Sequence, residues 1–189
     1  MIKYIITMIL AALTLMANPK GNSMENLTEI YLGGGCFWGT QGYFDLINGV
    51  VYSEVGYANG ISDQTSYNQI ARTDHAEVVR LKFDANRVDI NEILEHYFRI
   101  IDPFSINKQG NDIGRQYRTG IYYNDDKLKS VIEDFISRKQ AKFTKPIAVE
   151  IEPLKNYIKA EEYHQKYLDK NPNGYCHIDL NLASKPLYD

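Results

Sequence analysis

Three consecutive glycines, residues 33–35, constrain this chain more than any other feature of its 189 residues. They follow residues 28–32, whose alternating, β-branched side chains predict a strand. They precede residues 36–47, which place apolar side chains at helical spacing. Glycines between a strand and a helix bring Cys36 to the first helical turn, where backbone N–H groups lack partners and the helix dipole is positive. Because this setting lowers the pKa of a thiol, the sequence predicts a reactive cysteine.

The rest of the chain shows a mixed series of strand and helix patterns. Strands are predicted at residues 50–57, 76–83, 119–123 and 148–152, and helices at residues 90–101, 125–139 and 160–169. A long polar loop covers residues 102–118. Since strands and helices do not alternate strictly, the order favours an α+β fold of two layers over a doubly wound parallel sheet.

The N-terminal segment differs from the rest. Lys3 precedes an apolar run over residues 4–17, the pattern of a secretory signal. The run is shorter than the roughly 20 residues of a membrane span. We therefore predict a signal peptide and short linker at residues 1–23, a single domain at residues 24–189, and a periplasmic or secreted location. An uncleaved anchor, or translation from Met24 with a cytoplasmic location, remains an alternative.

Composition excludes some partners and leaves one question about the cysteines. The net charge of −3 gives no general attraction for nucleic acid, and no phosphate-binding glycine loop or basic aromatic stripe is present. The chain holds two cysteines, Cys36 and Cys176. A structural disulfide is one interpretation of the pair, but a domain of this length does not need one for stability.

The residues around Cys36 sharpen this choice. Aromatic side chains beside a reactive thiol suit a methyl or thioether group. The pentapeptide Gly35-Cys36-Phe37-Trp38-Gly39 resembles the signature of the A-type peptide methionine sulfoxide reductases, in which this cysteine is the nucleophile. Further motifs match in the same order: Val55-Gly56-Tyr57 with Gly60, Ser66-Tyr67, His75-Ala76-Glu77, Gly110-Asn111-Asp112, Gln116-Tyr117-Arg118 and Asn171-Pro172-Asn173-Gly174-Tyr175-Cys176.

The resemblance implies a ferredoxin-like α/β sandwich with extra elements and a long C-terminal loop. It also implies reduction of the S epimer of methionine sulfoxide, free or in proteins. By position, Glu77 resembles the acid that gives a proton to the sulfoxide oxygen, and Tyr67 and Tyr117 resemble the phenols that hydrogen-bond this oxygen. Phe37 and Trp38 resemble the walls around the substrate's methyl group.

The remaining matches concern substrate positioning and recycling. Asp112 resembles a carboxylate that positions the substrate, and Cys176 resembles the cysteine that resolves the oxidised nucleophile. A thioredoxin-like reductant is the implied partner, which reopens a disulfide between Cys36 and Cys176. We expect a monomer without cofactor or metal, and without a stable membrane span in the mature form.

The chemistry requires these residue types independently of the resemblance. Sulfoxide sulfur is a poor electrophile until its oxygen is protonated, and a carboxyl kept neutral by desolvation can supply that proton. Tyrosine hydroxyls can stabilise charge on the oxygen. Attack by a thiolate leaves a sulfenic acid, which a second thiol converts to a disulfide.

Three features depart from the family pattern, and three alternatives to the reductase function remain. Asp74 stands where the family commonly has glycine, the segment between Tyr67 and Glu77 is slightly short, and no cysteine follows Cys176. His177 is a candidate for lowering the pKa of the adjacent thiol. The alternatives are a cysteine hydrolase or acyltransferase using Cys36 with a histidine base, a zinc-binding module, and a secreted structural protein with an inert disulfide.

Overall fold

The computed structural model describes residues 27–188. The predicted signal peptide and linker, residues 1–23, lie outside these residues, so their prediction stays open. Within the described part of the chain, no helix is both long enough and apolar enough to cross a membrane.

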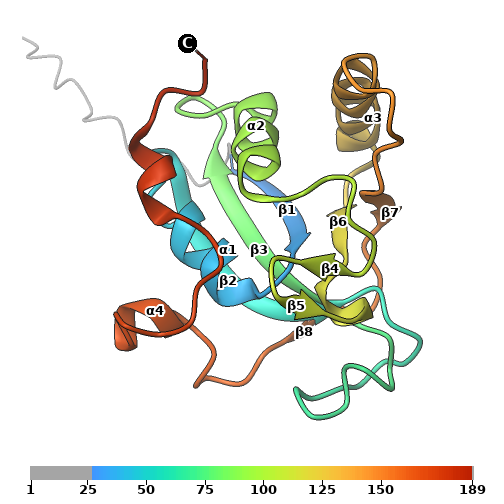
Figure 1. The fold of residues 1–189 in the computed structure, drawn as a ribbon, viewed down its shortest axis with the longest axis vertical. Helices are drawn as coiled ribbons and strands as arrows, with labels where there is room; N and C mark the ends of the chain where they lie inside the picture. The colour runs from blue at the N-terminus through green and yellow to red at the C-terminus, as the bar shows by residue number, and fades with distance from the viewer. Residues whose placement is uncertain (1–26, 189) are drawn as a thin grey trace, which may run out of the picture.

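A six-stranded sheet forms the centre of the molecule (Figure 1). Its strands lie in the order β7-β6-β1-β3-β2-β8. Their bounds are β1 Leu27–Gly34, β2 Val50–Ala58, β3 Ala76–Asp84, β6 Thr119–Tyr123, β7 Glu150–Pro153 and β8 Ile158–Lys159. The pairs are antiparallel except β6 with β7, which is parallel and is connected through α3. A separate two-stranded sheet joins β4, Lys108–Gln109, to β5, Asp112–Ile113.

Two of the helices, α1 and α2, and four central strands form a ferredoxin-like unit. The helices are α1 Phe37–Phe44, α2 Ile90–Ile100, α3 Asp126–Gln140 and α4 Tyr167–Lys170, with 3₁₀ turns η2 Arg115–Tyr117 and η3 Leu180–Ser184. In chain order, β1-α1-β2-β3-α2-β6 is the βαββαβ arrangement. The strands β7 and β8 extend its two edges. The predicted α+β, ferredoxin-like fold is therefore confirmed.

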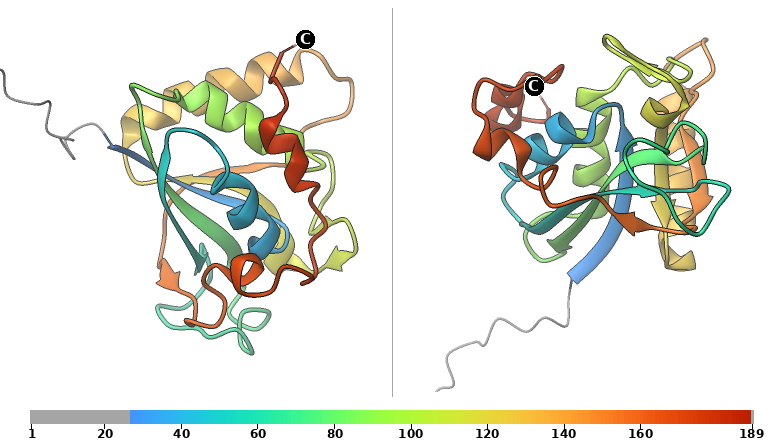
Figure 2. Two further views of the ribbon diagram at one scale, coloured as in Figure 1. Left: turned by 90° about the vertical axis from the view of Figure 1, so that its left-hand side faces the viewer. Right: turned by 90° about the horizontal axis from the view of Figure 1, so that it is seen from below.

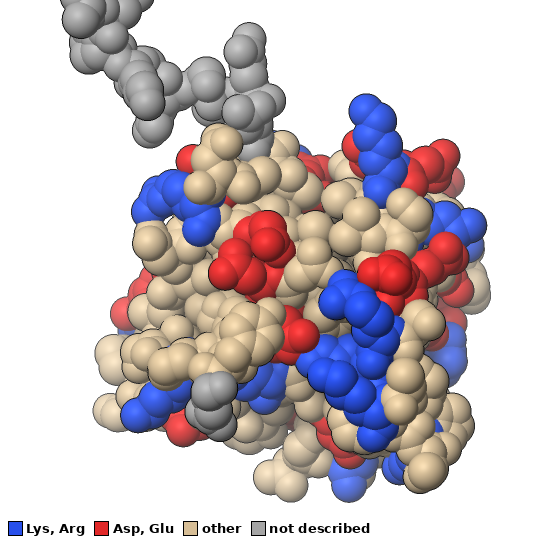
Figure 3. All heavy atoms as spheres, turned by 90° about the horizontal axis from the view of Figure 1, so that it is seen from above, with Lys and Arg blue, Asp and Glu red and all other residues tan. Residues whose placement is uncertain are grey.

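The two faces of the sheet are covered differently. Alternate residues of β1, Ile30 and Leu32, point into a large core shared with α1, α2 and α3, whereas Tyr31 joins a smaller cluster with Val78 and Tyr122 on the opposite face. Figure 2 shows α2 and α3 lying side by side over the face of the sheet that carries the large core. On the surface seen in Figure 3, acidic and basic side chains are mixed, and neither sign dominates.

One predicted helix is wrong. Residues 160–169 were expected to be helical, but only α4, Tyr167–Lys170, forms. Lys166 has a left-handed backbone (φ 51°), and its N–H donates to Gln41 Oε1 at 2.8 Å. The side chain of Gln165 bonds to the backbone of Val55 on β2. These hydrogen bonds to distant segments hold residues 165 and 166 in a non-helical conformation, so tertiary contacts override the local helical pattern.

Two further differences concern short strands. The polar loop predicted at residues 102–118 contains β4, β5 and η2, and β8 pairs with β2 at the sheet edge. Each of these strands has two residues, too few for a periodic pattern of side chains to reveal.

Candidate active site

A glycine with a positive φ angle precedes Cys36, the predicted nucleophile. Gly35 has φ 80°, and a Cβ at this position would lie 2.6 Å from Gln109 Cβ, so a side chain is excluded on both counts. Cys36 follows as the N-cap of α1, without a side-chain cap hydrogen bond. The first N–H groups of α1 are therefore available to the site.

Burial and the helix N-terminus shift the pKa of Cys36 in opposite directions. Its side chain is buried, with 6% exposed. Burial raises the pKa of the thiol, and the negative charge of ionised Glu77 raises it further, whereas backbone N–H groups of Trp38 and Gly39 lower it. The net shift is upward. The prediction of a lowered pKa is thus wrong for the resting protein, because burial outweighs the helix N-terminus.

Glu77 places a buried carboxyl beside Cys36. It lies on β3 with 1% exposed, and its Oε2 accepts a hydrogen bond from the Phe37 N–H at 3.0 Å. Burial raises the pKa of Glu77 to about 8, and the charge of Asp112 contributes, although the bond from Phe37 acts in the opposite direction. Below that pH the carboxyl is mainly protonated, as a general acid must be.

Two phenols lie near this carboxyl. Tyr117 ends η2, and Tyr67 lies in the loop between β2 and β3. Burial raises the pKa of both hydroxyls, and ionisation of Glu77 above about pH 8 raises both further. Each phenol therefore remains a hydrogen-bond donor at neutral pH.

The predicted walls of the methyl pocket differ in burial. Phe37 is fully buried, and its ring centroid lies 5.9 Å from that of Tyr57. Trp38 is half-buried and stacks on Tyr167, with ring centroids 3.7 Å apart. Its Nε1–H donates to His164 Nδ1 at 3.1 Å, which fixes the orientation of the indole.

His164 and Glu161 also lie at the site, although the sequence does not predict them as site residues. His164 is buried, and because its Nδ1 accepts from Trp38, its proton resides on Nε2. Glu161 accepts the Tyr57 hydroxyl at 2.7 Å and the Tyr67 N–H at 3.1 Å. Both lie where a helix was predicted, and no local pattern distinguishes them.

Asp112 contacts the C-terminal segment. Its Oδ2 accepts the Tyr175 hydroxyl at 3.1 Å and lies 3.5 Å from His177 Nδ1. Burial lowers the pKa of His177. A Cβ added at Gly35 would lie 3.1 Å from the His177 ring. The imidazole therefore packs against the turn before Cys36. The pKa shift of Cys176 comes from burial and the bond to Ile178, and His177 is not among its causes.

Cys176 lies against the first turn of α1. A Cβ added at Gly39 would lie 3.0 Å from its Sγ. The thiol donates to Ile178 O at 3.1 Å, and burial raises its pKa. Both cysteines are free thiols in this structure. All eight predicted site residues thus gather around the start of α1: Cys36, Phe37, Trp38, Tyr67, Glu77, Asp112, Tyr117 and Cys176.

Comparison with known proteins decides the family. Residues 28–189 match the sequence profile described as peptide methionine sulfoxide reductase. The chain belongs to this family. The reduced form of Mxr1 from Saccharomyces cerevisiae is 38% identical to this reductase, with a TM-score of 0.74 over 81% of this chain and 90% of that one. Methionine sulfoxide reductase A of Corynebacterium diphtheriae is 34% identical, with a TM-score of 0.71 over 82% of this chain and 80% of that one.

A third similar structure is Mxr1 from Saccharomyces cerevisiae in complex with Trx2. It is 26% identical to this reductase, with a TM-score of 0.54 over 82% of this chain and 94% of that one. Together these similarities confirm the predicted reductase activity of A type, and the hydrolase alternative is not favoured. Within residues 27–188, no group of three or more histidine, cysteine or acidic side chains is arranged to hold a metal ion.

Proposed function

We propose that this reductase acts on the S epimer of methionine sulfoxide with Cys36 as nucleophile and Glu77 as proton donor. The observation that carries the proposal is the buried carboxyl of Glu77, whose pKa is raised to about 8 and which accepts the N–H of the residue next to Cys36. A neutral acid and a thiol at one helix start are the two groups that sulfoxide reduction requires.

In the first step, Cys36 Sγ bonds to the sulfoxide sulfur while Glu77 passes its proton to the oxygen. Tyr67 and Tyr117 hydrogen-bond that oxygen as its charge develops. The hydroxyl then moves from the substrate sulfur to Cys36 Sγ as the bond between the two sulfur atoms breaks, so methionine leaves and Cys36 becomes a sulfenic acid. The proton that the Cys36 thiol loses restores the acid form of Glu77. One sulfoxide and one thiol have then become one thioether and one sulfenic acid.

In the second step, Cys176 attacks the Cys36 sulfur, and water leaves as the disulfide forms. The closeness of Cys176 Sγ to Gly39 supports this role, because Gly39 lies one helical turn from Cys36. A thioredoxin-like dithiol then reduces the disulfide. The complex of yeast Mxr1 with Trx2 supports such a partner for this chain.

Turnover of the two separated sulfur epimers of a blocked methionine sulfoxide tests the proposal. With thioredoxin as reductant, we expect reduction of the S epimer alone and no activity in Cys36→Ser. We expect Cys176→Ser to release about one equivalent of methionine and then stop, because its sulfenic acid has no resolving thiol. A folded, fully reduced wild-type protein that reduces neither epimer would contradict the proposal.

We also propose that the enzyme works outside the cytoplasm. Lys3 followed by the apolar run over residues 4–17 supports this location. N-terminal sequencing of the protein recovered from its native host tests it. A mature chain that begins near residue 18 is expected, whereas one that begins at Met24 and remains in the cytoplasm would contradict it.

A further inference from the structure

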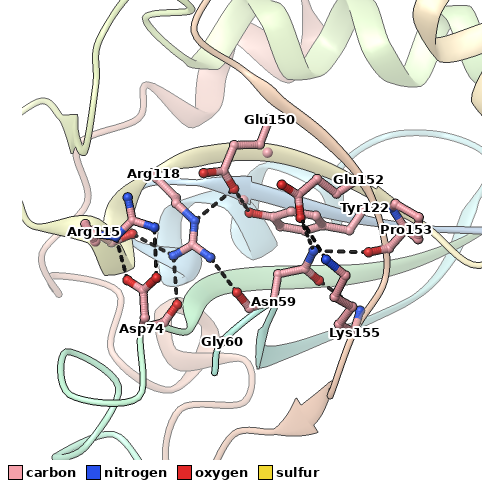
Figure 4. Close-up of polar contacts among 12 residues, drawn as sticks. Asn59, Gly60, Asp74, Arg115, Arg118, Tyr122, Glu150, Glu152, Pro153 and Lys155 are labelled. Carbon is pink, nitrogen blue, oxygen red and sulfur yellow. Dashed lines mark hydrogen bonds and ion pairs between the residues drawn. The ribbon is translucent and has the colours of Figure 1, made fainter. Parts of the chain in front are cut away.

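Two arginines join the turn that carries Tyr117 to the segment that leads into β3 (Figure 4). Arg115 opens η2, two residues before Tyr117, and Asp74 lies three residues before Glu77. The guanidinium of Arg115 donates from Nε to Asp74 Oδ1 at 2.5 Å and from Nη2 to Oδ2 at 2.8 Å. This two-pronged geometry fixes orientation as well as distance.

Arg118, on the other side of Tyr117, holds the backbone of the same region. It is buried, and its Nη1 donates to the carbonyl oxygens of Asp74 and Arg115, both at 3.1 Å. Its Nη2 donates to Asn59 O, and its Nε donates to Glu150 Oε2. Arg118 therefore supplies contacts between the two segments that do not involve the ion pair of Asp74 and Arg115.

The pair of Asp74 and Arg115 contributes little to stability by itself. The Arg115 side chain is 53% exposed, and exposed ion pairs are worth about 0–1 kcal/mol. Asp74 also has a left-handed backbone, with φ 53°, which glycine would adopt more freely. What aspartate offers here over glycine is a carboxylate. Among the described side chains, only Arg115 bonds to that carboxylate.

We propose that the ion pair of Asp74 and Arg115 is a positioning element for Tyr117. It fixes η2 against the segment that precedes Glu77, and so sets where the Tyr117 hydroxyl stands relative to the carboxyl that donates the proton. This positioning role assigns neither Asp74 nor Arg115 a contact with the substrate. The inference rests on the proposed function, in which Tyr117 binds the sulfoxide oxygen.

A single-turnover experiment tests the pair. Reduced protein without a recycling reductant is mixed with saturating S epimer of a blocked methionine sulfoxide, and the rate of methionine release is measured. We expect Asp74→Asn and Arg115→Gln each to slow this step about 10-fold, because small displacements of a catalytic group are costly. The double variant should match the single variants, since both remove one interaction.

Three controls separate positioning from general damage. Arg138→Gln removes another exposed pair, Arg138 with Asp134 on α3, and should keep the wild-type rate. All variants should keep a midpoint of urea unfolding close to that of wild type, because each removes an exposed pair worth at most about 1 kcal/mol. In a Tyr117→Phe background, Asp74→Asn should have no further effect, because the hydroxyl that the pair positions is gone.

The outcomes distinguish this inference from the proposed function. An active wild type with Asp74→Asn equally fast, or an effect of Asp74→Asn that persists undiminished in the Tyr117→Phe background, overturns the positioning role alone. A wild type that reduces neither epimer overturns the proposed function and this inference together.

Discussion

The two cysteines of this reductase lie in contrasting parts of the molecule. Every residue from 30 to 37 is buried, and Cys36 sits between the end of β1 and the start of α1. In residues 171–179, which carry Cys176, only Ile178 is buried, and no helix or strand forms. Cys36, the proposed nucleophile, is thus fixed by the sheet, whereas Cys176, the proposed resolving thiol, is held by a few contacts.

This contrast matches the demands on each thiol. Reduction of a sulfoxide needs a nucleophile, an acid and hydrogen-bond donors in fixed positions before the substrate arrives. Formation of a disulfide needs the second sulfur to come within bonding distance of the first, which requires a segment that can shift at low cost. The structure separates these demands by placing one thiol in the core and the other in an irregular segment.

The largest effect is expected from removing the proton of the buried Glu77 carboxyl. Glu77→Gln should slow single-turnover reduction by about 10³-fold, because the acid is lost while the packing is kept. Wild-type activity should fall as pH rises through about 8, where Glu77 ionises, and the variant should lack this decline. Rates measured between pH 6 and 9 provide the test, and a wild-type rate that keeps rising above pH 8 would contradict it.

The same substitution should have the opposite effect on stability. The folded state holds the Glu77 proton up to about pH 8, whereas the unfolded chain loses it near pH 4.5. Wild-type stability therefore declines between these values through this group, and Glu77→Gln avoids the decline. Urea unfolding should show the variant gaining on wild type as pH rises. A constant difference at every pH would show that Glu77 is not held neutral.

An intermediate effect is expected where the two regions meet. In Gly39→Ala, the new Cβ would lie 3.0 Å from Cys176 Sγ and 3.2 Å from Ile178 Cδ1, so the C-terminal segment must shift. We expect disulfide formation to slow about 10-fold and methionine release to change less than about 2-fold. Quenched-flow counts of free thiols and of methionine separate the two steps.

Gly42→Ala is the matched control for this variant. It adds the same methyl group to α1, but toward Leu168 rather than Cys176. It should leave both steps near their wild-type rates. Equal slowing of both steps in Gly39→Ala would mean that the substitution disturbs the nucleophile rather than the approach of the second thiol.

The smallest effect is expected at His177. Its imidazole faces Asp112 and the Gly35 turn, and Cys176 instead donates to Ile178 O. We therefore expect His177→Ala to change the rate of disulfide formation by less than about 2-fold at pH 7, since the thiol keeps its surroundings. A loss of 10-fold or more would indicate that the histidine assists the second thiol directly.

The sequence predicted the features that depend on neighbouring residues. The strand, the glycine turn and the helix around Cys36 are local, as are the periodic patterns of β3 and α2. Contacts between distant segments were not predictable in this way. The bond from Trp38 to His164 spans 126 residues, and the buried Glu77 acts on Cys36 across 41 positions (77 − 36). For this reason the position of Cys36 at the start of a helix was predicted correctly, but the direction of its pKa shift was not.

The raised pKa of Cys36 has a consequence for the survival of the enzyme. Peroxides attack thiolates far more readily than thiols, and a buried thiol with a raised pKa presents little thiolate at neutral pH. We therefore expect Cys36, which is also buried from solvent, to react slowly with peroxides in the resting protein. If Cys36 stays a thiol until a sulfoxide enters the site, the enzyme keeps its activity under the conditions that oxidise methionine.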